Sequence, residues 1–426
     1  MNAGAIPASG FFSVFAMKRK LSFPKEKIRI LLLEGIHAAA EESFRAADYS
    51  NVERVKSALP ENELLERVPG IHILGIRSKS KVGARILQAA PQLLAVGCFC
   101  IGTDQVDLEA ATSKGIAVFN APFSNTRSVA ELTIAEVVML ARRAVQRSME
   151  LHAGRWDKSA SGCMEVRQKT IGIVGYGHIG PQVGLLAEAL GMRVVFHDIS
   201  RKLPLGNAQQ VTSLEEVLKI SDFVTLHVPD TLLTRGMIGA GQLSLMRKGS
   251  FLLNLSRGSV VDIPALRAAI LSGSLAGAAV DVFPQEPGSS REPFISELRG
   301  LPNVILTPHI GGSTEEAQRN IGIEVSDALI KFSDTGSSTG CVNLPEVELP
   351  LLRDSHRVLN IHRDVPGVLG GINSLVAAMG ANINRQFLNT RNGVGYLIMD
   401  VERSLSRAIK TRIEALDTNI RTRLLF

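Results

Sequence analysis

The sequence predicts an α/β protein with two doubly wound parallel sheets, each covered by helices on both faces, followed by a small βαββαβ unit. Short runs of Val, Ile and Leu alternate with helical stretches along most of the chain, which is typical of parallel sheets covered by helices. The composition agrees, because 45% of the residues are hydrophobic, only 5% are aromatic and 38 are glycines, which suits many strand-to-helix turns. A chain of 426 residues is also longer than one hydrophobic core usually becomes, so two or three domains are expected.

The charge and the cysteines limit the possible classes of function. The net charge of +6 is modest, and no dense basic run with interleaved aromatic residues indicates a nucleic-acid partner. The four cysteines form no CxxC pair, so we expect no metal site and free or buried thiols in a reducing compartment. They are Cys98, Cys100, Cys163 and Cys341.

The first 24 residues are expected to be a disordered extension of a cytoplasmic protein. Their apolar run, 11–17, is too short to span a bilayer. It also precedes the basic cluster 18–20, which is the reverse of the order in a secretory signal. No membrane contact is therefore expected.

The first sheet is expected in a domain that comprises 25–124 and, after the chain returns, 312–345. Its strands are predicted at 28–34, 72–78, 93–98 and 116–120, and its helices at 38–47 and 82–90. A helix at 314–331 should bring the chain back to this domain. The Gly-, Ser- and Thr-rich stretch 334–340 is expected to be a linker.

The second sheet is expected in a domain over 125–311, which opens with a long helical segment at 128–152. A strand at 170–177 then leads into the glycine motif GYGHIG at 175–180. Further apolar strands, each with a polar, Gly or Pro ending, are predicted at 193–198, 223–229, 250–256, 276–283 and 304–310. In open α/β sheets ligands bind beyond the carboxyl ends of the strands, so these endings should line one crevice.

The third unit, 354–426, has the order strand, helix, strand, strand, helix, strand. Its strands are predicted at 357–362, 382–389, 395–402 and 420–426, and its helices at 367–379 and 405–415, with a turn at 391–393. That order is typical of a ferredoxin-like sandwich.

The motif GYGHIG predicts a nucleotide-binding turn of Rossmann type. Gly175 would allow the tight turn, Gly177 would let the backbone approach a pyrophosphate, and Gly180 would permit close helix packing. The N–H groups at the start of the following helix would face the phosphates. A lone GxGxxG is weak, but this one follows a predicted strand and precedes a predicted helix.

Asp198 strengthens the nucleotide interpretation, because it ends the next strand at about the 20-residue spacing expected for a ribose-binding carboxylate. An ionised carboxylate there would accept from the ribose hydroxyls and repel a 2′-phosphate, which favours NAD over NADP. Arg201 and Lys202 lie close enough in sequence to weaken that preference.

Three titratable or charged residues at predicted strand ends suggest hydride-transfer chemistry. Arg257, in LSRGS, could bind a carboxylate, and His309, in TPHIGGS, could take a hydroxyl proton while hydride leaves the carbon. Glu286, in DVFPQEP, could orient that imidazole and raise its pKa. A structural salt bridge, an incidental loop histidine and a surface glutamate are the simpler interpretations. The occurrence of all three in one domain favours a catalytic site.

These motifs resemble those of a known family. NAPFSNTRSVAE, GYGHIG, LSRGSVVD, DVFPQEP and TPHIGGST are similar to signatures of the D-isomer-specific 2-hydroxyacid dehydrogenases. CFCIGTDQVDL and the third unit, which resembles an ACT domain, bring the match to the branch that acts on 3-phosphoglycerate. The resemblance extends from about residue 25 to the end of the chain.

The resemblance implies a role for individual residues. It makes Arg257, Glu286 and His309 the catalytic trio. Beyond the glycines and Asp198, the NAD contacts implied are His178, Ile179, Leu255, Ser256, Asp281, Ile310, Gly311 and Gly312. The substrate contacts implied are Arg77 for the phosphate, Ser78 and Asn125 for the carboxylate, and, with less distinctive surroundings, Lys56 and Lys158. Trp156, the only tryptophan, resembles a residue at a subunit contact.

The implied reaction is oxidation of 3-phosphoglycerate to 3-phosphohydroxypyruvate with NAD, the entry to serine synthesis, with 2-oxoglutarate as a possible second substrate. The implied assembly is a homo-oligomer, with a dimer as the minimum and a tetramer expected. Two alternatives stay open. One is a reductase for glyoxylate, hydroxypyruvate or 2-oxoglutarate with the same trio, and the other is a NAD-responsive binding protein that uses the fold as a scaffold.

The third unit is implied to bind serine as a feedback inhibitor, with contacts from His362, Asp364 and Asn382. Asp364 departs from the pattern, since serine-regulated relatives carry asparagine there. An amide can donate to the effector carboxylate, whereas an ionised Asp would repel it. Serine inhibition is therefore a hypothesis, and a role in oligomer assembly alone is the alternative.

Overall fold

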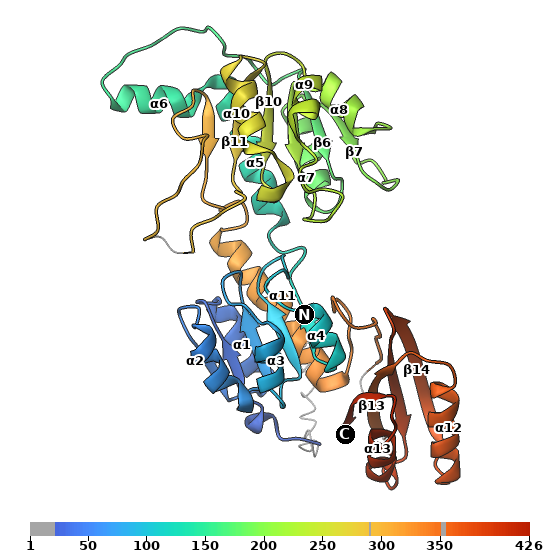
Figure 1. The fold of residues 1–426 in the computed structure, drawn as a ribbon. Helices are drawn as coiled ribbons and strands as arrows, with labels where there is room; N and C mark the ends of the chain where they lie inside the picture. Colours follow the sequence, from blue (N-terminus) through green and yellow to red (C-terminus); the bar gives the residue numbers. More distant parts are fainter. Residues whose placement is uncertain (1–21, 289–290, 351–354) are drawn as a thin grey trace, which may run out of the picture.

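The structure, a computed structural model, describes residues 22–288, 291–350 and 355–426. It contains a five-stranded, a seven-stranded and a four-stranded sheet. In Figure 1 the seven-stranded unit lies above the five-stranded unit, and the C-terminal unit lies beside the latter. Most of the expected extension 1–24 lies outside the described residues. Its last part is placed, because the Ser22 backbone N–H donates to the Phe426 carbonyl at 3.2 Å.

The five-stranded sheet has the order β2-β1-β3-β4-β5, and all its strand pairs are parallel, as predicted. Its strands are β1 Ile30–Leu32, β2 Val52–Arg54, β3 Ile73–Ile76, β4 Ala95–Cys98 and β5 Ala117–Phe119. Its helices are α1 Ala38–Ala46, α2 Glu61–Arg67, α3 Ala84–Ala89, α4 Leu108–Ser113 and the returning α11 Glu315–Thr335, with short 3-10 turns at Lys25–Lys27 and Val68–Gly70. The edge strand β2 was not predicted, because its sequence VER contains no apolar run and two of its residues are exposed.

Both faces of this sheet are covered. Ile30 and Leu32 face one cluster, in which α1 and α11 pack, whereas Leu31 faces the opposite cluster with α2, α3 and α4. Successive strand residues point to opposite faces, so a strand buried on both sides is a continuous apolar run. This is the physical reason that IRILLLE indicates a central parallel strand.

The seven-stranded sheet has the order β12-β11-β10-β9-β6-β7-β8, and it is also entirely parallel. Its strands are β6 Thr170–Val174, β7 Arg193–His197, β8 Gln209–Gln210, β9 Phe223–Leu226, β10 Ser250–Asn254, β11 Leu275–Val280 and β12 Val304–Leu306. Its helices are α5 Thr126–Arg142, α6 Ala144–His152, α7 Ile179–Ala189, α8 Leu214–Ile220, α9 Ala240–Leu245 and α10 Ile263–Leu271, with a 3-10 turn at Gly258–Val260. The strand order reverses between β6 and β9, which is where such sheets bind ligands.

The long helix expected at 128–152 is two helices. Arg143 adopts a left-handed backbone with φ of 53°, and its N–H donates to the Leu140 carbonyl at 3.1 Å, which ends α5. Left-handed backbone at a residue other than glycine is uncommon, and the local sequence contains no Gly or Pro that would signal it. Helix α5 then packs on the sheet, whereas α6 has no buried residue and leaves it.

The C-terminal unit is an antiparallel four-stranded sheet of order β14-β15-β13-β16, and the ferredoxin-like prediction is confirmed. Its elements are β13 His356–Arg363, α12 Val368–Ala378, β14 Ile383–Arg391, β15 Val394–Val401, α13 Ser406–Glu414 and β16 Asn419–Leu425. Both helices cover one face, where Ile372 and Ile409 share a cluster with Val358. Among the described residues, no helix combines the length and apolar character that crossing a membrane requires.

The stretch 334–340, expected to be a linker, is packed rather than free. Helix α11 continues to Thr335 and ends at Gly336, whose φ of 78° permits the left-handed cap. Ser338 is fully buried, and its hydroxyl donates to the Pro345 carbonyl and accepts from the Val347 N–H. The face of the C-terminal sheet that its own helices leave uncovered packs against the core of the five-stranded unit beside this stretch. The Tyr396 hydroxyl donates to the Gly336 carbonyl at 2.6 Å.

A fully buried ion pair lies at this junction. Nε and Nη2 of Arg357 donate to the two oxygens of Asp400 at 2.7 and 3.0 Å. Nη1 donates to the Thr335 carbonyl, and Nη2 also donates to the Pro350 carbonyl. The side chains of Arg357 and Asp400 are 0% and 2% exposed. A buried charge that is paired and fully hydrogen-bonded is tolerated, but one left alone is costly.

Replacing Asp400 by Asn should therefore lower the free energy of unfolding by about 3–5 kcal/mol, because Arg357 would remain charged and buried. Urea or calorimetric unfolding of the variant measures the loss. The double change Arg357→Met with Asp400→Leu removes both charges and should cost less than the single change. A single variant as stable as the double would contradict this account.

Candidate active site

Three neighbouring strands present the proposed catalytic residues. Arg257 follows β10, Glu286 follows β11 and His309 follows β12, and these strands are adjacent in the sheet. Because the strands are parallel, their carboxyl ends open at one edge of the sheet. Arg257 and His309, which are 52 positions apart in the sequence, therefore lie at the same edge of the sheet.

His309 and Glu286 are in direct contact. The His309 Nδ1 lies 2.9 and 3.0 Å from the two carboxylate oxygens of Glu286. A carboxylate only accepts hydrogen bonds, so the proton is assigned to Nδ1. The other ring nitrogen, Nε2, is then left for a proton of the substrate.

The contact changes the ionisation of both groups. The hydrogen bond that His309 donates to Glu286, together with the negative charge of Glu286, outweighs the effect of burial and raises the pKa of His309 above its ordinary value. Burial alone would raise the pKa of Glu286, but the hydrogen bond and charge of His309, with a smaller effect of Arg257, lower it overall. Glu286 is therefore ionised near neutral pH, and it stabilises a proton taken up by the imidazole.

Asp281 holds the His309 loop in place. His309 has a left-handed backbone, with φ of 56°, which is unfavourable for a residue other than glycine. The buried carboxylate of Asp281 accepts from the Thr307 hydroxyl at 2.6 Å and from the Ile310 and Gly311 N–H groups at 2.8 Å. The Asp281 carbonyl accepts from the His309 N–H at 2.8 Å. Asp281 was expected to contact NAD, and in this structure its carboxylate fixes the catalytic loop.

Arg257 lies at the opening between the two parallel-sheet units. Its guanidinium donates to the Ser256 carbonyl at 2.8 Å. A Cβ atom placed on Gly102, which follows β4 in the other unit, would lie 3.5 Å from Nη2 of Arg257. The guanidinium therefore extends from one unit to the loop of the other, where a substrate between the units would meet it.

The glycine motif fits a dinucleotide. Gly175 has φ of 91°, and a Cβ there would lie 2.3 Å from the His227 carbonyl. A Cβ on Gly180 would lie 2.5 Å from the Gly175 carbonyl, whereas one on Gly177 would meet nothing within 4 Å, so the turn is tight but open outward. Helix α7 starts at Ile179 after His178, which makes no side-chain cap, so its first N–H groups are available to phosphates.

Asp198 lies where a ribose contact is expected, at the end of β7. Its oxygens accept from the Tyr176 N–H at 2.9 Å and from the Ser200 N–H and hydroxyl at 3.0 Å. Burial would raise its pKa, but the Ser200 and Tyr176 hydrogen bonds and the charge of Lys202 lower it overall. The Lys202 Nζ is 4.0 Å from one oxygen, so a cation partly offsets the negative charge that disfavours NADP.

The other residues expected to contact NAD differ in how exposed they are to a bound cofactor. Leu255 and Ser256 are buried, and the Ser256 hydroxyl donates to Asn254 at 2.8 Å. Ile310 is 42% exposed. The chain passes between the two parallel-sheet units twice, near Asn125 and near Gly312. A Cβ on Gly312 would lie 2.3 Å from Nδ2 of Asn125, so this glycine permits the two segments to approach closely.

Asn125 and the loop after β3 border the same opening. The Oδ1 of Asn125 is buried and has no hydrogen-bond partner among the described residues. Arg77 and Ser78 follow β3, and Arg77 is partly buried whereas Ser78 is exposed. Lys56 is exposed in the loop after β2, which is on the same edge of that sheet.

Glu34, which was not singled out in the sequence, shapes the Arg77 loop. Its carboxylate accepts from the backbone N–H groups of Arg77, Lys79 and Ser80 at 3.0, 2.9 and 2.8 Å. The Gln105 side chain donates to the Arg77 carbonyl at 2.8 Å. The signal was present, because Glu34 is the charged residue that ends the apolar run IRILLLE.

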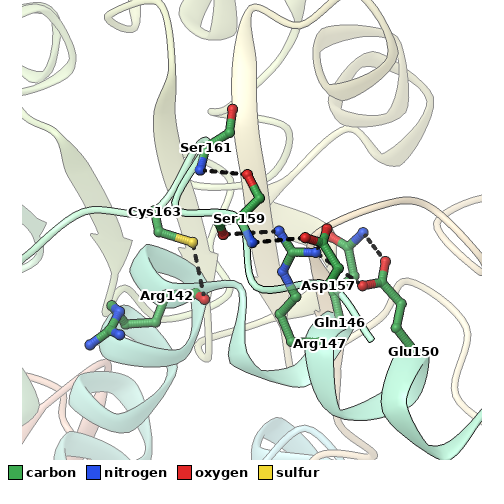
Figure 2. Close-up of polar contacts among 8 residues, drawn as sticks. All are labelled: Arg142, Gln146, Arg147, Glu150, Asp157, Ser159, Ser161 and Cys163. Atoms are coloured by element: carbon green, nitrogen blue, oxygen red, sulfur yellow. Dashed lines mark hydrogen bonds and ion pairs between the residues drawn. The ribbon is translucent and has the colours of Figure 1, made fainter. Parts of the chain in front are cut away.

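Lys158 is not brought to this site within one chain. Helix α5 starts beside Gly312 and ends at the opposite edge, where the Leu140 carbonyl accepts from Asn303, just before β12. Lys158 follows α6 beyond that edge, in a loop held by an Arg147–Asp157 ion pair and by the Ser159 N–H donating to Asp157 at 2.8 Å (Figure 2). Lys158 is therefore separated from the Arg77 loop by the length of the seven-stranded sheet.

The expected effector residues lie at opposite ends of the C-terminal sheet. His362, near the end of β13, is buried, and its Nδ1 lies 2.9 Å from the side-chain oxygen Oδ1 of Asn360. Asp364 is exposed just beyond it, whereas Asn382 precedes β14, whose first residue is paired through β15 with the start of β13. One chain does not bring the three residues together. Among the described residues, no group of His, Cys, Asp and Glu is arranged to hold a metal ion.

Comparison with known proteins agrees with this geometry. Residues 134–311 match the family described as D-isomer specific 2-hydroxyacid dehydrogenase, NAD binding domain. Two solved structures share the fold and are 27% identical to this chain. D-2-hydroxyisocaproate dehydrogenase has a TM-score of 0.66, with 74% of this chain and all of that one covered. D-lactate dehydrogenase from Aquifex aeolicus, complexed with NAD and lactic acid, has a TM-score of 0.64, with 75% and 100% covered.

The chain belongs to the D-isomer specific 2-hydroxyacid dehydrogenases, and it is an oxidoreductase with a NAD-binding domain. Two full-length relatives define its branch. D-3-phosphoglycerate dehydrogenase of Dictyostelium discoideum is 52% identical over 405 residues, which cover 95% of this chain and 99% of that protein. The enzyme of the same name from Escherichia coli K12 is 52% identical over 409 residues, covering 96% and 100%. Within the family, the chain falls among the D-3-phosphoglycerate dehydrogenases.

Replacing Glu286 by Gln should lower the pKa of His309. Oxidation of a hydroxy acid needs neutral His309, so its rate rises as the pH rises through that pKa, and reduction falls over the same interval. In the variant both transitions should move to lower pH, and the maximal rate should fall about 10- to 100-fold, as loss of a hydrogen bond to a charged group predicts. Profiles of kcat/KM against pH in both directions measure the shift. Unchanged transitions would separate Glu286 from the ionisation of His309.

Proposed function

We propose that this protein oxidises 3-phospho-D-glycerate to 3-phosphohydroxypyruvate with NAD, the first step of serine synthesis. The observation that carries the proposal is the His309–Glu286 hydrogen bond at the strand ends that also present Arg257. The full-length similarity to D-3-phosphoglycerate dehydrogenases supports the choice of substrate.

The proposed mechanism assigns one task to each residue. Arg257 binds the substrate carboxylate and polarises the adjacent carbon. Nε2 of His309 takes the proton of the C2 hydroxyl as the carbonyl forms, and Glu286 stabilises the resulting imidazolium. Bound NAD supplies the acceptor for the C2 hydride. Proton and hydride therefore leave the two atoms of the bond that becomes the carbonyl.

The substrate phosphate is assigned to the Arg77 loop. The loop is held by Glu34 through its backbone, so the Arg77 side chain remains available. Lys56 is a second candidate cation at the same edge. This assignment separates the proposal from a reductase for hydroxypyruvate, glyoxylate or 2-oxoglutarate, which would need no phosphate contact. 2-Oxoglutarate remains a possible second substrate.

Arg77→Ala should lower kcat/KM for phosphohydroxypyruvate about 10- to 100-fold, the effect of losing a charge-assisted contact, and should change that for hydroxypyruvate little. Absorbance of NADH at 340 nm follows both reactions. Lys79→Ala is the matched control, because Lys79 is an exposed cation of the same loop. Equal losses on both substrates would favour the reductase. No turnover of either substrate by the unaltered protein, with tight NADH binding, would favour a scaffold.

We further propose a homo-oligomer that uses two separate surfaces. The α6 region exposes Trp156 at 79%, Met149 at 69% and Leu151 at 55%. The edge strand β14 exposes Phe387 and Leu388, and its outer side has no paired strand among the described residues. Two self-complementary surfaces on one chain generate a closed tetramer, and either alone generates a dimer. In such an assembly the α6 region of a neighbouring copy would bring its own Lys158 to the substrate opening, which the Lys158 of the same chain does not reach.

Serine is the effector we propose for the C-terminal unit. His362 and Asp364 lie at one end of the sheet and Asn382 at the other, so an effector that touches all three would lie between two copies paired along β14. The free β14 edge supports such pairing. A cytoplasmic location is also proposed, supported by four free cysteines.

Asp364 should weaken serine inhibition, because its carboxylate repels that of serine. We expect inhibition of the unaltered protein only at higher serine concentrations than those that inhibit Asp364→Asn. Steady-state rates with and without serine decide this, with D-serine as the control ligand. Strong inhibition of the unaltered protein would show that Asp364 is compatible with the effector. No inhibition of either protein would favour a purely assembling role.

A further inference from the structure

A cavity of about 710 Å³ lies between the five-stranded unit and the C-terminal unit. On one side its lining includes Ile28, Tyr49, His72 and Leu94, which precede the strands β1, β2, β3 and β4. The cavity is therefore at the amino edge of that sheet, whereas the Arg77 loop is at the carboxyl edge. Its size is in the range that holds small-molecule ligands.

The cavity carries an excess of positive charge. Four cationic side chains line it, from Lys25, Arg407, Lys410 and Arg423, against the side-chain carboxylate of Asp334 and the main-chain terminal carboxylate of Phe426. They come from the first unit, from helix α13 and from strand β16. Four cations minus two carboxylates leaves an excess of two positive charges.

The side-chain carboxylate of Asp334 already has two partners. Asp334 accepts from Lys25 at 2.6 Å and from the Tyr49 hydroxyl at 2.7 Å, so Lys25 and Asp334 neutralise one another. Lys410 contacts Glu414, one turn further along α13, at 2.7 Å. Arg407 lies over the Phe426 ring, with 6.0 Å from Cζ to the centroid, and has no carboxylate partner among the described residues.

Arg423 is partly buried, and its hydrogen-bonding capacity is only partly used. One nitrogen, Nη2, donates to the Ser333 carbonyl at 3.1 Å, and the guanidinium lies over the Phe332 ring at 5.1 Å. Its other terminal nitrogen, Nη1, is buried and has no hydrogen-bond partner in the described part of the chain. A buried unsatisfied donor on a charged group is costly, and an anion in the cavity would satisfy it.

We propose that this cavity is a second ligand site, which binds a small organic dianion of the phosphate or dicarboxylate type between the two units. The charged end would be met by Arg407, Lys410 and Arg423. The apolar part of the lining, which includes Leu425 and Phe426, would meet the organic part of the ligand. Contacts to both units would make the ligand stabilise their junction.

The site is separate from the proposed catalytic opening, so the proposal does not depend on the proposed reaction. No residue of the cavity lining is among those assigned to substrate, NAD or serine. The test must still distinguish the cavity from the Arg77 loop, which would also attract phosphate.

Isothermal titration calorimetry of the full-length protein tests the proposal. Sodium phosphate and sodium succinate are titrated separately into protein in chloride buffer of matched ionic strength, so that general screening is constant. Binding of either anion is expected, and Arg77→Ala should retain it. The double variant Arg407→Ala with Lys410→Ala should bind at least about tenfold more weakly, the effect of lost charge-assisted contacts.

Arg412→Ala is the matched control, because Arg412 is an exposed cation of the same helix outside the lining, and it should bind as the unaltered protein does. Arg407→Ala alone changes only an exposed side chain and serves if the double variant does not fold. Phosphate-only or succinate-only binding would identify the head group. The proposal fails if neither anion binds, if Arg77→Ala abolishes binding, or if the α13 variants bind as tightly as Arg412→Ala.

Discussion

The buried carboxylate of Asp281 is the constraint on which the proposed active site depends. It lies directly after β11, between the strands that carry Arg257 and His309, and it accepts hydrogen bonds from three groups of the loop after β12. Those bonds hold His309 in a left-handed backbone conformation that an isolated chain would rarely adopt. The imidazole then meets Glu286 with its Nδ1, and its Nε2 is left for the substrate. The parallel strands bring Arg257, Glu286 and His309 to one edge of the sheet. Asp281 then sets the orientation of His309, the residue that accepts the proton.

The strand ends and the glycine turn were predictable, because buried parallel strands are continuous apolar runs and a dinucleotide turn needs glycine at fixed positions. Gly175 illustrates this, since a Cβ there would collide with the His227 carbonyl. The break at Arg143 was not predictable, because the left-handed residue is neither Gly nor Asn and only tertiary packing determines it. The linker prediction for 334–340 was wrong for a related reason. Composition indicates flexibility, but Ser338 is buried by contacts with residues that follow it.

The sequence also could not predict which expected residues share a site. The position of Glu34 at the end of an apolar run marks it as unusual, but the sequence does not show that its carboxylate accepts from three backbone N–H groups of the Arg77 loop. Lys158 belongs to a motif close in sequence to α5, yet α5 crosses the whole sheet and leaves Lys158 at the opposite edge. His362 and Asn382 are 20 positions apart, but antiparallel pairing places them at opposite ends. In each case the direction of a helix or strand, rather than spacing along the chain, determines proximity.

The two connections between the parallel-sheet units lie side by side. Asn125 and Gly312 are in close contact, and the hydroxyls of Ser128 and Thr314 are 2.9 Å apart. A single tether would let the units tumble independently, whereas paired tethers leave one main degree of freedom, rotation about the line through them. A rotation of one unit relative to the other about that line would change the separation between Arg257 and the loop at Gly102. Contacts far from the cleft can influence catalysis if they favour one value of that angle.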